Sequence, residues 1–253
     1  MPHRATRLFK WIMVALLAAL LLSALPVLLL RAWHPLTSAF MLRARLEARA
    51  ANDLHYRTHY EWVDYAHIAP NAALAVIASE DQQFPFHYGF DLNSIRQAQI
   101  SNEEGGRVRG ASTISQQLAK NLFLWPGKSY LRKALEAWFT VLLESLWPKQ
   151  RILESYLNIV QFGPGVYGVE AAAQEFFHSS AARLTPGEAA LLAAVLPNPE
   201  RLHADRPSRY VDERRAWIMG QMRTLAAEDY LSLVARESRP PQPRPEPLRH
   251  SRR

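Results

Sequence analysis

The chain has 253 residues, a hydrophobic content of 49% and no cysteine, which excludes a wholly disordered protein, a disulfide framework and a thiol nucleophile. This length allows one sizeable buried core once any membrane segment is set aside. The net charge of +7 at pH 7 predicts an anionic partner: nucleic acid, acidic lipid or a phosphorylated substrate.

A run of twenty residues without charge, 11–30, lies near the amino terminus and follows a basic segment, 1–10. At about 1.5 Å per residue, a helix of this length spans a hydrocarbon core of about 30 Å. A cleaved signal peptide is the alternative, but the run is long for one and no small-x-small cleavage site follows it. We therefore predict an uncleaved transmembrane anchor. Cations flank both ends of the run, so charge alone leaves its orientation open.

The rest of the chain predicts a mostly α-helical protein with few strands. A connector over residues 31–69 contains one helix at 40–51, and a soluble domain covers residues 70–237. The proline- and arginine-rich tail, 238–253, is predicted to be disordered. Within the domain, hydrophobic periodicity and helix stop signals predict helices at 72–79, 92–102, 114–123, 130–147, 150–160, 186–196, 207–225 and 227–235. Glycine and proline predict turn-rich loops at 105–110 and 161–168.

Candidate capping residues predict three of these helix starts. Asn71 is a candidate cap for the first helix of the domain. Thr113 with Gln116, and Thr185 with Glu188, each form the pattern of a capping box.

Glu80 and Asp81 come at the carboxyl end of the first domain helix, where the helix dipole disfavours negative charge. Carboxylates placed there without a structural partner are candidates for function, and a solvated helix end is the structural alternative. A second carboxylate, Glu136, follows Arg132 by four residues on one helix face. An ordinary ion pair worth a few tenths of a kcal/mol is the alternative there.

Hydroxyl, amide and ammonium groups recur at helical spacing between the two glutamates, at Thr113, Gln117, Lys120 and Asn121. A solvent-facing surface is the usual explanation for a polar helix face, but the surrounding apolar sequence leaves this helix little free surface. Lys120 and Arg132 are suited as counter-charges for a pyrophosphate.

Other motifs fail. Gly127-Lys128-Ser129 lacks the first glycine of a P-loop, no H-E-x-x-H occurs, and the histidines show no metal-ligand spacing. On spacing alone, Phe84 and His87 are packing residues rather than catalysts. We assign no metal-ligating side chain.

Five segments follow one another along the chain: Glu80-Asp81-x-x-Phe84-x-x-His87-x-Gly89, Gly110-x-Ser112-Thr113-Ile114-Ser115-Gln116-Gln117-x-x-Lys120-Asn121, Arg132-Lys133-x-x-Glu136, Arg151-Ile152-Leu153-Glu154-x-Tyr156-Leu157-Asn158 and Gly168-x-Glu170-Ala171-Ala172-Ala173. In this order they resemble the successive signatures of the peptidoglycan glycosyltransferases, the family of class A penicillin-binding proteins and their monofunctional relatives. With one anchor and no transpeptidase motif, it most resembles the monofunctional biosynthetic transglycosylases.

The resemblance implies a lysozyme-like helical lobe and a smaller membrane-proximal jaw lobe near residues 96–109. It implies that Glu80 is the general base that deprotonates the acceptor, lipid II. Attack then inverts the anomeric carbon of the growing chain, and undecaprenyl pyrophosphate leaves. On the donor side it places Glu136, Lys120, Arg132 and Lys133, with a divalent cation, Mg or Mn, as a further possible ligand of the pyrophosphate.

The resemblance further implies that Asp81, Phe84, His87, Thr113, Gln117 and Asn121 line the cleft or hold the carboxylates. It places the anchor in the bacterial inner membrane and the domain in the periplasm, with residues 1–10 in the cytoplasm. The expected partners are lipid II, the growing glycan chain and other cell-wall or division proteins, and not nucleic acid. Two alternatives stay open at this point: a membrane-anchored lytic muramidase, and a non-catalytic scaffold of the divisome.

Overall fold

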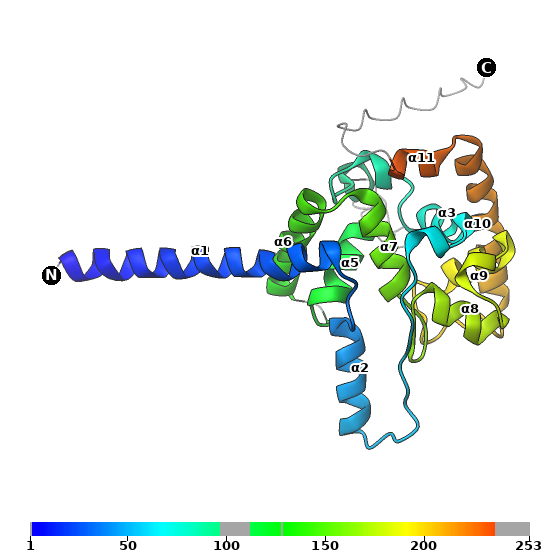
Figure 1. Cartoon of the computed structure of the whole chain (residues 1–253), viewed down its shortest axis with the longest axis horizontal. Helices are drawn as coiled ribbons and strands as arrows, with labels where there is room; N and C mark the ends of the chain where they lie inside the picture. The colour runs from blue at the N-terminus through cyan, green and yellow to red at the C-terminus, as the bar shows by residue number, and fades with distance from the viewer. Residues whose placement is uncertain (1, 97–111, 128, 236–253) are drawn as a thin grey trace.

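The computed structural model describes residues 2–96, 112–127 and 129–235. Across these residues the chain is mostly α-helical, as predicted, with a helical domain at one end of a long amino-terminal helix (Figure 1). The smaller lobe expected near 96–109, the glycine-rich loop at 105–110 and the tail at 238–253 lie wholly or almost wholly outside the described residues. The helix expected at 92–102 is described only as far as residue 96.

The amino-terminal helix α1, Pro2–Ala32, projects from the domain and confirms the predicted long apolar helix. Its segment Phe9–Ala32 is long and apolar enough to cross a membrane. Pro26 lies inside this helix.

Apart from the helix predicted at 92–102, the predicted helices of the domain are confirmed with small shifts at their ends, and one further helix, α8, was not predicted. The described helices that follow α1 are α2 (Ala39–Ala50), α3 (Pro70–Glu80), α5 (Ile114–Phe123), α6 (Tyr130–Leu146), α7 (Lys149–Ile159), α8 (Val169–Phe177), α9 (Pro186–Val195), α10 (Arg209–Ala227) and α11 (Tyr230–Ala235). Short 3-10 turns occupy Tyr65–His67, Phe84–Phe86 and Ala181–Arg183. Both predicted capping boxes, at Thr113 and Thr185, are present.

The predicted cap at Asn71 is wrong. Helix α3 begins at Pro70, two residues before the predicted start at residue 72, with Ala69 in the cap position. Proline suits the first helical position because its missing N–H would have no intrahelical partner there. Asn71 instead donates a hydrogen bond from Nδ2 to the carbonyl oxygen of Leu184, 3.0 Å away, and so ties α3 to the segment before α9.

The loop predicted at 161–168 contains two short strands. Strands β2 (Gln161–Gly163) and β3 (Val166–Tyr167) pair antiparallel, and β1 (His59–Tyr60) from the connector pairs parallel with β3. The turn signal was right, since Gly165 has φ +73° and any Cβ there would lie 2.3 Å from the carbonyl oxygen of Arg57. The strands were missed because two or three residues are too few to show an alternating pattern.

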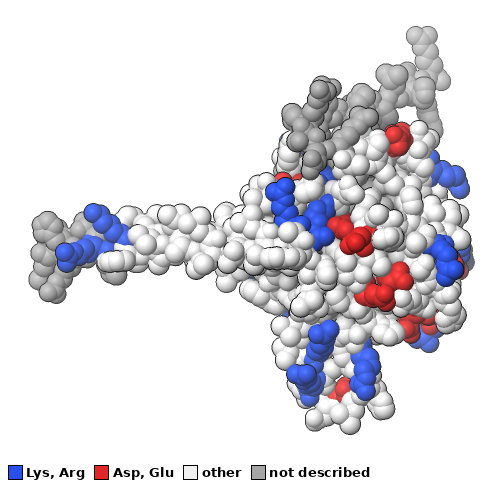
Figure 2. All heavy atoms as spheres, viewed as in Figure 1, with Lys and Arg blue, Asp and Glu red and all other residues white. Residues whose placement is uncertain are grey.

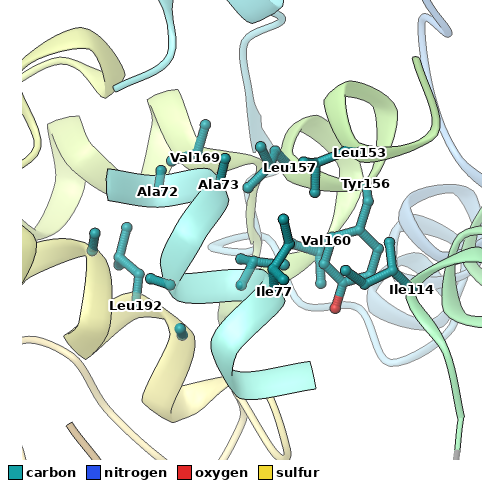
Figure 3. Packing of buried hydrophobic residues seen from close by; sticks show 14 of the residues in the cluster. Ala72, Ala73, Ile77, Ile114, Leu153, Tyr156, Leu157, Val160, Val169 and Leu192 are labelled. Atoms are coloured by element: carbon teal, nitrogen blue, oxygen red, sulfur yellow. The ribbon is translucent and has the colours of Figure 1, made fainter. Parts of the chain in front are cut away.

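Helix α3 runs through the centre of the domain. Every residue from 72 to 78 is buried, and α7, α9 and α10 surround the helix. In Figure 3, Ala72 and Ala73 lie between Leu192 of α9 and Val169, while Ile77 points toward Val160 and Tyr156. The small alanine side chains allow this close approach, and they place the end of α3, with its two carboxylates, deep in the structure.

Candidate active site

Glu80 is the last residue of α3 and Asp81 follows it as the C-cap. The Glu80 carboxylate accepts hydrogen bonds from Ser79 Oγ at 2.8 Å and from Gln117 Nε2 at 2.9 Å. Arg214 of α10 lies 3.5 Å from Glu80 Oε1 and donates to Ser79 Oγ at 3.1 Å. These donors and the guanidinium charge offset the unfavourable position at the carboxyl end of a helix dipole.

Tyr156 of α7 orients the amide that contacts Glu80. Its hydroxyl donates to Gln117 Oε1 at 2.8 Å, so the amide oxygen of Gln117 is used and its NH2 group faces Glu80. Burial, together with the negative charges of Glu80 and Asp81, raises the pKa of Tyr156 well above its ordinary value. Tyr156 therefore stays a protonated donor. Two hydrogen bonds in series, from Tyr156 to Gln117 and from Gln117 to Glu80, position the Glu80 carboxylate.

Asp81 is buried and serves as a structural hub. Its carboxylate lies 3.0 Å from His87 Nε2 and accepts from the backbone N–H of Ile114, the first residue of α5, at 3.0 Å. The N–H of Gly89 donates to His87 Nδ1, which places the imidazole hydrogen on Nε2 and makes that atom the donor to Asp81. Phe84 is fully buried and meets the His87 ring edge-on. Asp81, Phe84 and His87 thus support the site from beneath Glu80.

Thr113 joins the same network from the start of α5. Besides its capping role, its hydroxyl donates to the carbonyl oxygen of Gly89 at 2.7 Å. Gly89 has φ +81°, and a Cβ there would lie 2.5 Å from Thr140 Cγ2 of α6. Glycine is therefore required where the segment after His87 passes between α5 and α6.

The cations gather around Glu136 on α6. Glu136 is 3% exposed, and its carboxylate accepts from Arg132 Nη1 at 2.7 Å and from Lys133 Nζ. Within the described residues, Arg132 Nε is buried without a hydrogen-bond partner. A buried donor left unpaired costs about 1–3 kcal/mol, which is typical of a site that a ligand completes.

Lys120 of α5 links the two ends of the site. Burial lowers the pKa of its ammonium group, and the carboxylates of Glu136 and Glu80 partly oppose this shift. Since both carboxylates act on Lys120, the structure brings together the groups that the sequence separates by 56 residues. Lys120 Nζ also lies 5.5 Å from the centre of the Phe40 ring on α2. Asn121, the next residue of α5, is buried.

An open pocket lies against Glu80 and Asp81, and several of its walls were not predicted. It is lined by residues 78–83 and by Asp91, Ser94, Ser112, Thr113 and Trp217. Arg214 and Trp217 come from α10, more than 130 residues after Glu80, and no local pattern marks them. Tyr156 belongs to a segment that carried the family resemblance, but its bond to Gln117 was not expected.

Comparison with known proteins decides the family. Residues 47–223 match the family model described as Transglycosylase. The chain belongs to the transglycosylase family. Three relatives are named biosynthetic peptidoglycan transglycosylase. The protein of Xanthomonas euvesicatoria pv. vesicatoria is 53% identical over 230 residues, 91% of this chain and 93% of that protein. The Klebsiella oxytoca protein is 56% identical over 195 residues, which is 77% of this chain and 81% of that protein. The Pseudomonas fluorescens protein is 50% identical over 234 residues, which is 92% of this chain and 97% of that protein.

These matches confirm the prediction of an enzyme, a peptidoglycan glycosyltransferase. The roles of the individual site residues of the transglycosylase stay predictions, because family membership alone assigns none of them.

A metal held by this transglycosylase's own side chains does not fit the described part of the site. Those residues contain no group of three or more His, Cys, Asp or Glu side chains that could hold a metal ion. Glu136 is already paired with two cations, and Glu80 with Gln117, Ser79 and Arg214. We therefore derive no step through a metal.

Proposed function

We propose that this transglycosylase polymerises lipid II into glycan strands with inversion and releases undecaprenyl pyrophosphate. One observation carries the proposal: Lys120 lies within reach of the charges of both the Glu80 carboxylate and Glu136, and Glu136 pairs with the largely buried Arg132 and the half-exposed Lys133. A glycosyl transfer from a pyrophosphate donor needs both a carboxylate and cations, because a base must activate the acceptor and cations must stabilise the leaving group.

At the acceptor end, Glu80 takes the proton of the acceptor's 4-hydroxyl group. The oxygen forms a bond to the anomeric carbon of the growing chain from the face opposite the pyrophosphate. The bond between that carbon and the pyrophosphate oxygen breaks, and its electron pair leaves with undecaprenyl pyrophosphate. Glu80 then returns its proton to solvent, and the lengthened chain keeps its own lipid pyrophosphate for the next cycle.

At the donor end, the guanidinium of Arg132 and the ammonium groups of Lys120 and Lys133 meet the charge that develops on the leaving pyrophosphate. Glu136 holds two of these cations at fixed positions through its buried carboxylate. A preorganised cluster stabilises the transition state without reorganising during the reaction. A divalent cation, still only a prediction, would bind chiefly through the substrate's phosphate oxygens, as Mg²⁺ commonly does.

Incubation of the purified protein with labelled lipid II tests the proposal against its alternatives. Long glycan strands are the expected product. Cleavage of preformed peptidoglycan without polymerisation would instead indicate a muramidase, and neither activity would indicate a scaffold. The donor cations argue against a hydrolase, which has no pyrophosphate to stabilise. We also propose an inner-membrane location with a periplasmic domain; the membrane-length segment Phe9–Ala32 supports the membrane part of this proposal.

Lys120 is expected to set an alkaline limit on activity. Because burial lowers the pKa of its ammonium group below the ordinary 10.5, Lys120 loses its charge at a lower pH than an exposed lysine does. The rate should therefore fall as pH rises through that lowered pKa. Lys120→Arg keeps the charge at every accessible pH, so its alkaline limb should move to higher pH. Identical alkaline limbs in the kcat–pH profiles of the two proteins would contradict this role.

Arg214 is expected to act as a positioning residue for Glu80. Arg214→Gln removes the guanidinium 3.5 Å from the carboxylate and the bond to Ser79, and kcat for lipid II polymerisation should fall about tenfold, or ~1.4 kcal/mol, with a smaller change in KM. The neighbouring Arg215 supplies the matched control, because its Nε donates to the carbonyl of Gly187 instead. Equal losses in Arg214→Gln and Arg215→Gln would show a structural effect of α10 only.

A further inference from the structure

An ion pair that the mechanism does not use joins the end of α6 to the start of α7. Figure 2 shows Lys, Arg, Asp and Glu side chains on the surface of the domain, where water solvates their charges. The side chains of Glu144 and Lys149 are instead only 5% and 17% exposed, and Glu144 Oε1 lies 2.7 Å from Lys149 Nζ. Apolar side chains of similar volume often stabilise a fold as well as a buried ion pair does, because they avoid the loss of hydration. Stability alone is therefore a weak explanation for this pair.

The pair is fastened to the start of α5. Ser115, the second residue of α5, is fully buried, and its hydroxyl donates to the same oxygen of Glu144 that Lys149 contacts. The preceding residue, Ile114, donates its backbone N–H to Asp81. Two adjacent residues of α5 thus bind two carboxylates, one at the end of α3 and one near the end of α6. The same contacts fix the helix that carries the amide and the ammonium of the site.

Lys149 also reaches the residues that support the proposed base. Its ammonium lies 4.6 Å from the centre of the Phe84 ring, which is the distance of a cation–π contact. Burial lowers the pKa of this ammonium group, and the negative charges of Glu144 and Asp81 oppose the shift. The charges of Lys149 and Asp81 therefore interact across the packed ring of Phe84 and its neighbours.

The charge balance beneath the site depends on this lysine. Asp81 and Glu144 each contribute a negative charge. His87 adds no charge, because its Nδ1 accepts a hydrogen bond from the N–H of Gly89 and carries no hydrogen. Within the group formed by Asp81, His87, Glu144 and Lys149, the lysine supplies the one positive charge. Its loss would leave two carboxylates to repel each other in surroundings where water screens them little.

We propose that Lys149 is a positioning residue of the transglycosylase: its charge holds Asp81 in place, and Asp81 in turn holds the end of α3 against α5, where Glu80 meets Gln117. This inference rests on the proposed polymerisation of lipid II, since it explains how the proposed base is kept in position. The role requires the ammonium charge, whereas a packing role would require only a side chain of the same volume. The two roles therefore give different results when the charge is removed and the volume is kept.

A neutral pair separates charge from packing. Lys149→Met/Glu144→Gln keeps the approximate volumes and leaves neither charge buried alone. The melting temperature should stay within about 4 °C of that of the unmodified protein. By contrast, kcat for lipid II polymerisation should fall about tenfold with little change in KM, because the base is misplaced rather than the substrate released. An unchanged kcat in the folded double variant would overturn the proposal.

The matched control removes an equal pair of charges from the surface. Arg209 and Glu213 of α10 form an ion pair whose side chains are 93% and 63% exposed. Arg209→Met/Glu213→Gln should polymerise lipid II at the unmodified rate, since exposed pairs contribute little. A tenfold loss in this control as well would show a general effect of charge removal and would contradict a specific role for Lys149.

Chemical restoration of the ammonium gives a second test, which does not depend on the double variant. The natural sequence contains no cysteine, so Lys149→Cys introduces the sole thiol. Alkylation of this thiol with 2-bromoethylamine adds an ammonium group at about the length of lysine, whereas iodoacetamide adds a neutral amide of similar length. Mass spectrometry confirms each modification. Only the ammonium should raise kcat, by at least about fivefold, and equal recovery with both reagents or none with either would overturn the proposal.

The unmodified protein in the same assay distinguishes this inference from the proposed function. If the unmodified protein forms no glycan strands from labelled lipid II, the proposed function fails, and the role of Lys149 fails with it. If the unmodified protein and Lys149→Met/Glu144→Gln form strands at the same rate, the proposed function stands and only the role of Lys149 fails.

Discussion

Glu80→Gln is expected to abolish lipid II polymerisation while leaving the fold intact. Glutamine keeps the size of the side chain but cannot accept the proton of the acceptor hydroxyl, so kcat should fall about 100- to 10,000-fold. The fold should tolerate the change, because the carboxylate lines an open pocket and its partners, Ser79 and Gln117, can bond to an amide. The measurement is the rate of glycan strand formation from labelled lipid II, with thermal unfolding measured on the same preparation.

The control for this variant is Glu213→Gln, an acidic residue on α10 that pairs only with Arg209 at the exposed surface among its described contacts. It should polymerise lipid II at the unmodified rate. Substantial residual activity in Glu80→Gln would remove Glu80 from the role of base. A large loss of stability in that variant would instead make Glu80 a structural residue.

Glu136→Gln is expected to have the second largest effect, through the donor end of the site. The substitution leaves the cations of Arg132 and Lys133 without their shared counter-charge, in a place where Glu136 is 3% exposed. Polymerisation should slow about 100-fold, the size of a lost preorganised electrostatic contact. The free energy of unfolding should fall by roughly 1–3 kcal/mol, because a charged hydrogen-bond partner is lost in a buried site. Steady-state kinetics and chemical denaturation measure the two effects separately.

The chain offers a matched control in Glu47→Gln on α2. Arg43 and Glu47 have the same spacing as Arg132 and Glu136, but their side chains are 43% and 60% exposed. An exposed pair of this kind contributes about 0.3–0.5 kcal/mol, so both stability and activity should change little. If Glu136→Gln behaved like Glu47→Gln, the pair on α6 would be an ordinary intrahelical ion pair, as its spacing alone suggested.

The helices of the domain were largely predictable because the interactions that start and stop them are local. The capping boxes at Thr113 and Thr185 join residues three apart, and proline stops α6 at the boundary predicted. The position of Glu80 and Asp81 at a helix end was likewise readable from nearby residues. The short strands around Gly165 were not, because one of them pairs with a connector residue more than 100 positions earlier.

By itself, the sequence determined the membrane-length helix, the mostly helical fold and the family, and it predicted part of the candidate site. It identified Glu80 and Glu136, but it left each with a structural alternative of comparable weight. Only the tertiary structure decided how these groups are held: Arg214 reaches Glu80 from α10, Tyr156 orients Gln117, and Trp138 of α6, the helix of Glu136, donates a hydrogen bond to Ser23 of α1. The reason is physical. Caps, dipoles and spacing act within about one helical turn, whereas these contacts join residues 39 to 134 positions apart and arise only when the core brings their helices together.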